Sequence, residues 1–307
     1  MIVHSFPRVS RSFAAGLVIL LAGLASPAIA AKAKVQLVPS VKAVAPGEAF
    51  DVAFKFTIDK GWHIYWMNAG DAGLPPKVQW KLPNGFTAGK LRFPIPKRHT
   101  DKAALVTNIL EGKPVLLATI TPPKNFASTA KVTIAADLTW LVCEEQCLME
   151  RQSVSISLPV VSAAKDVELA EEKLFRRARR VMPVPAGRAK YVKLTPSIAN
   201  GSLAASSTFD VRLDVEIKHG FHIQSNRPLT AGLVATNVFM APVKELFFDP
   251  PVFPKPKIRM VPSFGKISEF AGRISIRVPV EVDDKLPGDS RNIGGLFVYQ
   301  ACSESGT

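Results

Sequence analysis

An internal duplication constrains the fold of this chain more than any other feature of its sequence. Short motifs in the first half recur about 159 residues later in the second half. In each copy a Gly-aromatic-His tripeptide precedes a cysteine by 80 residues, counted from the histidine. Collinear matches of this kind indicate a tandem repeat of about 110–120 residues per copy. The matching motifs are Gly61-Trp62-His63 and Gly220-Phe221-His222, Ala72-Gly73-Leu74 and Ala231-Gly232-Leu233, Phe93-Pro94-Ile95-Pro96 and Phe253-Pro254-Lys255-Pro256, and the apolar runs that lead to Cys143 and Cys302.

Each copy is predicted to consist of β-strands. Apolar residues alternate with polar or small ones at 50–58 and again at 209–217, which is the period of a half-buried strand. The 25 prolines among 307 residues also argue against a mostly helical chain. Short strands separated by Pro, Gly and Asn turns are typical of antiparallel sandwiches, so we expect an all-β fold of two tandem immunoglobulin-like β-sandwich domains. Further alternating runs lie at 116–120, 132–140 and 154–160 in the first copy and at 274–282 and 293–299 in the second.

Between the two copies the sequence predicts one helix. Within 167–181 apolar residues recur every three or four positions, acidic residues come early, arginines come late, and Pro183 follows. This pattern indicates an amphipathic helix whose charges complement its dipole and which ends before the proline. We therefore predict a helical linker at 163–190, between a first sandwich at 31–162 and a second at 191–307.

The first 30 residues have the composition of a secretory signal peptide. Arg8 and Arg11 precede a 12-residue apolar run at 13–24, and Ala28-Ile29-Ala30 supplies a small-x-small cleavage pattern. The run is shorter than the roughly 20 residues that span a bilayer. We therefore expect cleavage near Ala30 and export to the bacterial periplasm, a compartment in which disulfides persist.

The chain is strongly basic, with a formal net charge of +14. Part of this charge is concentrated in the arginines of 176–180, which could bind anionic lipid. We expect no nucleic-acid partner, because this run lacks interleaved aromatic residues and the chain is predicted to be exported. The sequence contains no Gly-rich phosphate loop, His-Glu-x-x-His motif or Gly-x-Ser-x-Gly motif.

The three cysteines are the main candidates for chemistry. Cys143 and Cys147 form a Cys-x3-Cys motif, and their Cα atoms would lie about 13 Å apart in a continuous strand. A disulfide requires less than about 7 Å, so the pair can bond only if the chain turns, as the polar Glu-Glu-Gln insert favours. A disulfide that closes so short a loop adds little chain-entropy stabilisation and tends to be reducible. From the spacing alone, three interpretations stay open: a redox-active pair, a structural disulfide and a pair of metal ligands.

Other residues could assist the cysteines. His63 and His222 could lie near the cysteine of their own copy and favour its thiolate, although a histidine after an aromatic residue is more often structural. The tryptophans at 62, 66 and 80 are interpreted as core or turn packing. A soft donor set that could hold Cu(I) comprises Cys143, Cys147, Met149, Met67 and His63.

Several motifs of the chain occur together in one known family. They are Gly61-Trp62-His63-Ile64-Tyr65-Trp66, Gly70-Asp71-Ala72-Gly73-Leu74-Pro75, the Phe-Pro-x-Pro elements, Trp140-Leu141-Val142-Cys143, Gly220-Phe221-His222-Ile223, Asn226-Arg227-Pro228 and Tyr299-Gln300-Ala301-Cys302. Together, across 35–307, they resemble the periplasmic N-terminal domain of DsbD-type thiol:disulfide interchange proteins, and the tandem form is most similar to the suppressor-of-copper-sensitivity B branch. The resemblance implies a sandwich whose cysteine pair takes electrons from a membrane-embedded domain. It also implies reduction of periplasmic thioredoxin-fold or disulfide-isomerase partners, with no organic cofactor.

Carried over residue by residue, the resemblance places Cys143 and Cys147 at the redox pair of copy one and Cys302 at the first position of the pair in copy two. The family usually has a second cysteine and a final strand soon after this position, so the second copy is expected to be C-terminally incomplete. The family's membrane and thioredoxin-like domains do not occur in the 307 residues. We therefore predict a protein-disulfide reductase with catalytic residues Cys143, Cys147 and Cys302. The alternative is a copper-handling or protein-docking module, in which the cysteines are metal ligands or form a structural disulfide.

Overall fold

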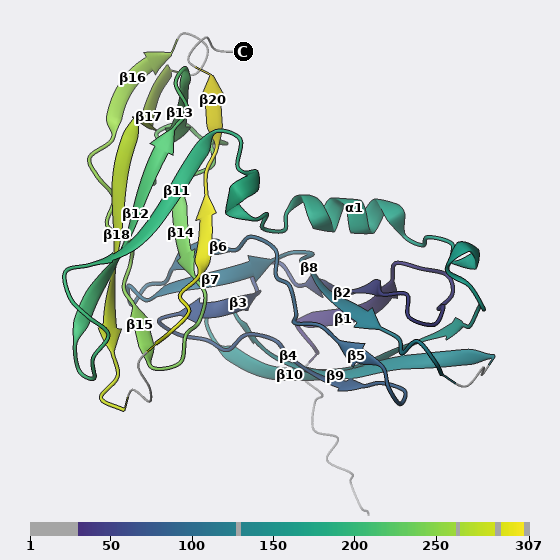
Figure 1. Cartoon of the computed structure of the whole chain (residues 1–307). Coiled ribbons are helices and arrows are strands. Elements are labelled where there is room, and N and C mark those ends of the chain that lie inside the picture. The colour runs from purple at the N-terminus through teal and green to yellow at the C-terminus, as the bar shows by residue number, and fades with distance from the viewer. Residues whose placement is uncertain (1–29, 127–129, 262–264, 286–289, 304–307) are drawn as a thin grey trace, which may run out of the picture. The chain divides into compact units, whose positions relative to one another are not determined.

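The computed structural model describes residues 30–126, 130–261, 265–285 and 290–303. By its internal contacts the chain divides into the segment Met1–Ala31 and one compact unit, Lys32–Thr307. The predicted signal peptide at 1–30 lies outside the described residues, apart from Ala30. The described part of the chain is mostly β, with several sheets and one short α-helix (Figure 1). No helix in these ranges is long and apolar enough to span a membrane.

The first copy forms two antiparallel sheets. One has the strand order β1-β2-β8-β5 and the other has the order β10-β9-β3-β7-β6, with β4 also paired to β9. The strands are β1 (Ala33–Pro39), β2 (Phe50–Ile58), β3 (His63–Gly70), β4 (Lys77–Lys81), β5 (Thr87–Ala88), β6 (Lys97–Thr100), β7 (Val106–Glu111), β8 (Val115–Thr121), β9 (Lys131–Cys143) and β10 (Cys147–Pro159).

The apolar faces of these two sheets share one core. Phe54 and Phe56 of β2 are fully buried and belong to the same apolar cluster as Leu138 and Trp140 of β9. The rings of Phe56 and Trp140 meet edge to face with their centroids 5.3 Å apart, a favourable arrangement for aromatic side chains. The alternation seen in the sequence is therefore the inward-facing set of residues on each strand.

The second copy repeats this topology. The order β11-β12-β18-β15 corresponds to β1-β2-β8-β5, and β16-β17-β13 corresponds to β6-β7-β3. The pairing of β14 with β19 corresponds to that of β4 with β9. The sheet order thus agrees with the duplication that the sequence indicates. The strands are β11 (Val192–Ala199), β12 (Thr208–Ile217), β13 (Phe221–Gln224), β14 (Asn237–Met240), β15 (Leu246–Phe248), β16 (Lys257–Val261), β17 (Gly265–Ala271), β18 (Arg273–Val282), β19 (Gly295–Val298) and β20 (Ala301–Ser303).

The run at 293–299, which the sequence predicts as one strand, is shorter in the structure. β19 pairs with β14, and β20 continues beyond a break to pair with β13. Gln300 lies at this break, where its carbonyl accepts a hydrogen bond from the backbone N–H of Gln224 at 3.1 Å. In the first copy the continuous strand β9 makes both corresponding pairings.

The linker contains less helix than the sequence predicts. α1 spans only Glu172–Arg180, and single 3-10 turns lie at Ala164–Asp166 and Ala186–Arg188. The predicted helix over 167–181 is therefore wrong at its N-terminal end, although its end before Pro183 is confirmed.

Backbone pairing explains the late start of α1. The N–H of Lys42 donates to the carbonyl of Glu168 at 2.9 Å, and the N–H of Ala170 donates to the carbonyl of Ser40 at 2.8 Å. These bonds satisfy backbone groups in an extended form, so tertiary pairing overrides the helical pattern there. The helix begins only after Glu171, whose φ of 49° is left-handed.

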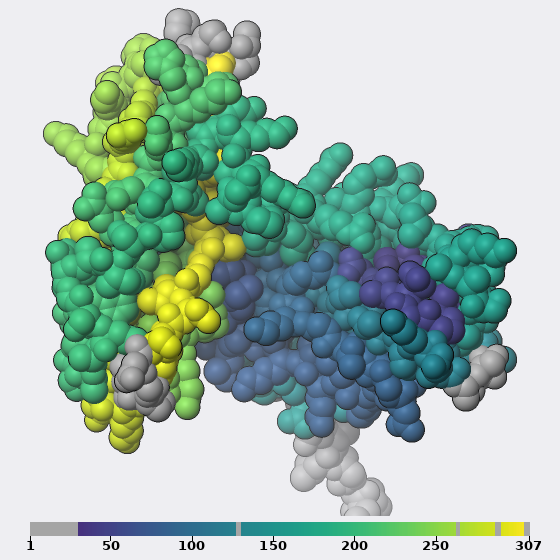
Figure 2. All heavy atoms as spheres, viewed as in Figure 1, coloured from purple at the N-terminus to yellow at the C-terminus, as the bar shows by residue number. Residues whose placement is uncertain are grey.

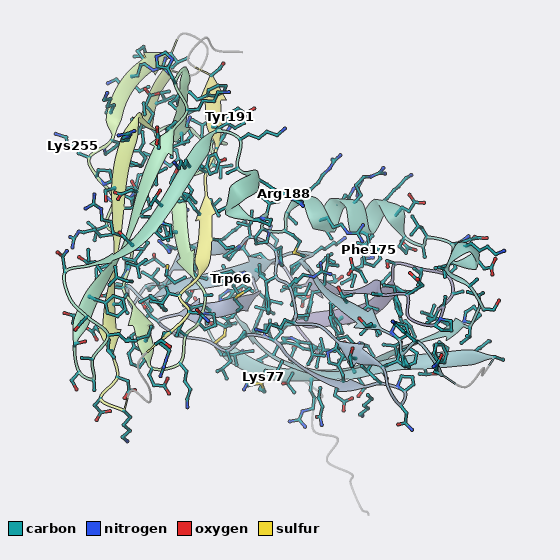
Figure 3. All side chains as sticks on the ribbon, viewed as in Figure 1. Trp66, Lys77, Phe175, Arg188, Tyr191 and Lys255 are labelled. Atoms are coloured by element: carbon teal, nitrogen blue, oxygen red, sulfur yellow. A yellow bond between two sulfur atoms is a disulfide. The ribbon has the colours of Figure 1, made fainter. Side chains whose placement is uncertain are left out.

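α1 packs on the outer face of the β1-β2-β8-β5 sheet (Figure 1). Phe175 and Ala178 are 2% and 3% exposed and contact Ala53 of β2 and Leu117 of β8. Figure 3 labels Phe175 on α1. These two strand residues point away from the main core, because successive side chains of a strand alternate between faces. The buried side of α1 is thereby fixed, and its opposite side is left to solvent.

A charged cluster ties α1 to the same sheet. Asp51 of β2 accepts hydrogen bonds from Arg179 of α1 at 2.9 Å, from Arg92 at 2.6 Å and from the hydroxyl of Thr119 at 2.9 Å. Burial raises the pKa of Asp51, but the hydrogen bonds of Arg179 and Thr119 and the charge of Arg92 outweigh it and hold this pKa below its usual value. Asp51 is therefore a carboxylate at neutral pH.

Candidate functional site

A β-hairpin brings Cys143 and Cys147 together. β9 and β10 pair along their whole length, and the two cysteines are directly opposite each other at the closed end. The chain turns through Glu144–Gln146, and the N–H of Glu144 donates to the carbonyl of Gln146 at 3.1 Å. The cysteines form a disulfide with their Cα atoms 4.2 Å apart. The turn predicted from the polar insert is confirmed.

The two sulfurs of this pair differ in their surroundings. Cys143 is only 2% exposed and packs in a small apolar cluster with Tyr65, Ala69 and Ile109. Cys147 begins β10 and is exposed. An incoming thiolate can therefore reach Cys147 far more readily than Cys143.

His63 is the residue across the sheet from Cys143. The β3–β9 register pairs His63 with Cys143, so both side chains emerge on the same face of the sheet. On its other side, His63 pairs with Glu111 of β7. Burial lowers the pKa of His63, the nearby His99 ring lowers it further, and Glu111 opposes both only in part. His63 is therefore a neutral imidazole at neutral pH.

The turn before His63 explains the Gly-aromatic-His motif. The N–H of Trp62 donates to the carbonyl of Asp59 at 3.1 Å, and Gly61 stands at the third turn position with a φ of 90°. The second copy has the same turn, in which Gly220 has a φ of 78°. Only glycine adopts such a φ without strain, and the turn sets the residue at which β3 and β13 begin.

The segment after β3 covers part of the site. Gly73, with a φ of 103°, lies so close to the ring of Tyr65 that a Cβ at this position would collide with it. The Tyr65 ring also meets that of His63 edge to face, with centroids 5.3 Å apart. Burial raises the pKa of Tyr65, as does the charge of Asp101, so its phenol keeps its proton at neutral pH.

The structure brings together only some of the residues that were predicted as a Cu(I) donor set. Met149 is 55% exposed and shares the disulfide's face of the hairpin, because it lies two residues after Cys147 on β10. Met67 instead packs against the main core. No group of three or more His, Cys, Asp and Glu side chains within the described ranges could hold a metal ion. Trp62 and Trp66 are buried in the core, and Trp80 packs against it, as the sequence indicates.

The second copy places Cys302 in a corresponding position. Cys302 of β20 is a free, half-buried cysteine that pairs in register with His222 of β13. Gln224, two residues after His222 and 1% exposed, donates from Nε2 to the Cys302 sulfur at 3.8 Å. Its Oε1 is buried and has no hydrogen-bond partner among the described residues. The predicted proximity of each histidine to the cysteine of its copy is confirmed in both copies as a cross-strand pair.

Two further charged residues support His222. Arg259 and Glu269 form a multiply bonded ion pair at 3.1–3.2 Å. His222 lies between them, with Nδ1 at 3.4 Å from Arg259 and Nε2 at 3.5 Å from Glu269. Sequence reasoning missed Gln224, Arg259 and Glu269. Only Gln224 carries a local signal, since its spacing of two from His222 places it on the same face of a strand.

Comparisons with known proteins gave a matching family model and a solved structure of similar fold. The family model "Thiol:disulfide interchange protein DsbD, N-terminal" matches residues 34–159. The crystal structure of the N-terminal periplasmic domain of ScsB from Proteus mirabilis is similar with a TM-score of 0.53 and 14% identity, covering 89% of this chain and 89% of that one. At this identity the similarity shows a shared fold alone.

Two other comparisons identify no related protein of known function. A protein of unknown function from Porphyromonas gingivalis W83 aligns over 82% of this chain and 84% of its own, at 12% identity and a TM-score of 0.23. The comparison with curated proteins gave no match. Residues 34–159, which build the hairpin and hold the Cys143–Cys147 disulfide, are thus the part of the chain that matches the DsbD N-terminal domain family model.

Proposed function

We propose that this chain is an exported thiol:disulfide interchange protein of the bacterial periplasm, with Cys143 and Cys147 as its redox pair. The observation that carries the proposal is the disulfide at the hairpin tip, with one exposed and one buried sulfur. An exchange protein needs one sulfur that partners can reach and a second that resolves the mixed disulfide.

In the reduced protein the Cys147 thiolate attacks one sulfur of a partner disulfide. A mixed disulfide forms and the partner releases its other sulfur as a thiolate. The Cys143 thiolate then attacks the Cys147 sulfur, restores the Cys143–Cys147 disulfide and releases the partner as a dithiol. Two electrons pass to the partner, and a membrane-embedded dithiol donor returns them by the reverse exchange. The partners are periplasmic thioredoxin-fold or disulfide-isomerase proteins.

His63 is a proton acceptor in this scheme. Only a thiolate attacks a disulfide, and a thiol packed among apolar side chains holds its proton tightly. Neutral His63 lies across the sheet from Cys143 and takes the proton as Cys143 attacks the mixed disulfide. It returns the proton when the donor reduces the pair.

Cys302 is the reactive thiol of the second copy. Its register partner is a histidine, as for Cys143, and the Gln224 amide donates to its sulfur. Cys302 therefore exchanges with external thiols or disulfides, since no second cysteine of the described residues lies beside it.

A reduction potential tests the main proposal. The Cys143–Cys147 pair is equilibrated with glutathione or dithiothreitol buffers, quenched with an alkylating reagent and counted by mass spectrometry. We expect a potential within the range of about −120 to −270 mV found for exchange proteins. A bond with a potential below about −300 mV, or one that dithiothreitol leaves intact in the native fold, would identify a structural disulfide and overturn the proposal.

A further inference from the structure

The solvent-facing side of α1 carries a concentrated positive charge. Successive residues of an α-helix are rotated by ~100° about its axis, which places four basic residues opposite the buried side of α1. They are Lys173, Arg176, Arg177 and Arg180. All four are exposed, and none of them forms an ion pair within the described ranges. We call these four residues the basic face. Figure 2 shows the teal α1 segment at the surface of the molecule.

A hollow adjoins the basic face. It has a volume of about 440 Å³, and Arg176, Arg179 and Arg180 contribute to its lining together with Leu169 and Glu172. Arg179 is held in place by Asp51 at 2.9 Å, so one guanidinium of the hollow is fixed. Guanidinium groups bind phosphate oxygens through paired N–H donors, which suits a hollow with several arginines to a phosphate group.

Exposed apolar side chains flank the same helix. Leu169, which lines the hollow, is 61% exposed, and Val181 and Val184 just after α1 are 49% and 66% exposed. Apolar side chains beside a row of cations are the pattern of segments that lie in a membrane interface. A phosphate-bearing polymer such as nucleic acid would leave these side chains in water.

We infer that the basic face and its hollow bind the surface of an anionic phospholipid bilayer. The arginines contact lipid phosphates, and Leu169, Val181 and Val184 enter the boundary between headgroups and acyl chains. The buried contacts of Phe175 and Ala178 hold α1 on the sheet, so the basic face is presented by a helix that is already folded. This inference concerns a surface separate from the cysteines and does not rest on the proposed redox function.

Co-sedimentation with vesicles tests the inference. The unit from Lys32 onward is mixed with vesicles of phosphatidylcholine alone or of phosphatidylcholine with phosphatidylglycerol, at low and high salt. We expect binding only to the phosphatidylglycerol vesicles, weakening as salt screens the charges. A triple variant Arg176→Gln, Arg177→Gln, Arg180→Gln should lose at least tenfold in partition coefficient, because each cation near an anionic surface contributes about fivefold.

A matched control removes the same charge elsewhere. Lys193, Lys255 and Lys266 are exposed lysines of the second copy, and their triple replacement by Gln should lower binding less than threefold (Figure 3 labels Lys255). Circular dichroism checks that both variants keep the fold. Equal losses in the two variants, or no binding of the unaltered protein to phosphatidylglycerol vesicles, would overturn the inference.

A charge-neutral variant separates a bilayer from other polyanions. Leu169→Ser with Val184→Ser keeps every charge, and we expect it to lower vesicle binding by about threefold to tenfold through lost apolar burial. Inorganic phosphate at millimolar concentration should not displace the protein from vesicles. Unchanged vesicle binding by this variant, or equally tight binding of duplex DNA, would assign the face to a general polyanion and contradict the bilayer.

Discussion

His63 lies directly opposite Cys143 across the antiparallel pair of β3 and β9. The second copy has the same relationship between His222 and Cys302 across β13 and β20. Cross-strand pairs have their Cβ atoms about 4.5–5.5 Å apart on one face of a sheet. An imidazole is thus held within reach of a cysteine by backbone pairing alone, in both copies.

The exposure of the two sulfurs predicts an asymmetric reactivity. In the reduced protein Cys147 should be alkylated at least tenfold faster than Cys143, because Cys143 is buried among apolar residues. Peptide mapping after short pulses of iodoacetamide measures this ratio. The variant Cys143→Ser should also accumulate a mixed disulfide with a small aromatic disulfide, whereas Cys147→Ser should react slowly. Equal rates at both sulfurs would contradict the proposed division of roles.

His63 should give the resolving step a distinct pH profile. Burial and the nearby His99 ring lower the pKa of His63. The imidazole is therefore neutral and able to accept a proton at any pH above about 6.5, the usual pKa of histidine. We expect a nearly flat rate of resolution between pH 7 and 8, measured by stopped flow on a preformed mixed disulfide. The variant His63→Phe should be about tenfold slower at pH 7 and should rise with pH toward the thiol pKa. Parallel profiles for the two proteins would assign His63 a purely structural role.

The lowered pKa of His63 also makes the free energy of unfolding depend on pH. Folded His63 binds its proton less tightly than unfolded His63, so its contribution to the free energy of unfolding is present above pH ~6.5. The contribution is lost as pH falls through the lower folded pKa. His63→Phe should therefore reduce the acid sensitivity of thermal unfolding below about pH 6.5, and an unchanged sensitivity would contradict the neutral state of His63.

Asp51 should stabilise the contact between α1 and its sheet. Asp51 accepts charged hydrogen bonds from Arg92 and Arg179, whose side chains are about half exposed. Solvent weakens these bonds, so Asp51→Asn should lower the free energy of unfolding by about 1–2 kcal/mol. The pKa of Asp51 lies below its usual value, so this loss should be constant above pH ~5 and should shrink as the pH falls below ~4. Urea unfolding at several pH values measures it. Asp137→Asn, which removes an exposed pair with Lys81, is the control and should change little.

Cys302 should be the one titratable thiol of the oxidised protein. Ellman's reagent should detect one thiol per chain, none in Cys302→Ser, and a disulfide-linked dimer should form on air oxidation of the unaltered chain. Gln224→Leu should slow the alkylation of Cys302 severalfold at pH 7, because it removes the amide that donates to the sulfur. A strictly monomeric protein whose Cys302 resists alkylation would show that this cysteine is inert.

The parts of the fold that the sequence predicts are those with local causes. β2 and β12 follow the alternation at 50–58 and 209–217 within a residue, because a strand with one buried face must alternate. The sequence also predicts the turn between Cys143 and Cys147, because three polar residues interrupt an apolar strand there. Each of these features depends on residues adjacent in the chain.

The parts that the sequence did not reveal depend on distant neighbours. Leu169 belongs to a helical stripe but forms a β-bridge with Val41, and this contact decides its conformation. The pairing of Glu269 and Arg259 beside His222 requires the register of β16, β17 and β13, which no short motif encodes. The burial of Cys143 likewise comes from residues of β3 and β7.

The hairpin of β9 and β10 has a consequence for the energy of the proposed redox cycle. Backbone pairing extends from the cysteines to Lys131 and Pro159, so we expect the two chain segments to stay aligned whether or not the sulfurs are joined. Oxidation and reduction then change one covalent bond at the end of a preformed scaffold, with little reorganisation of the sheet behind it. The driving force of each proposed exchange would then be set by the sulfur chemistry itself, and the packed core would not have to rearrange when the disulfide at the hairpin tip is reduced or re-formed.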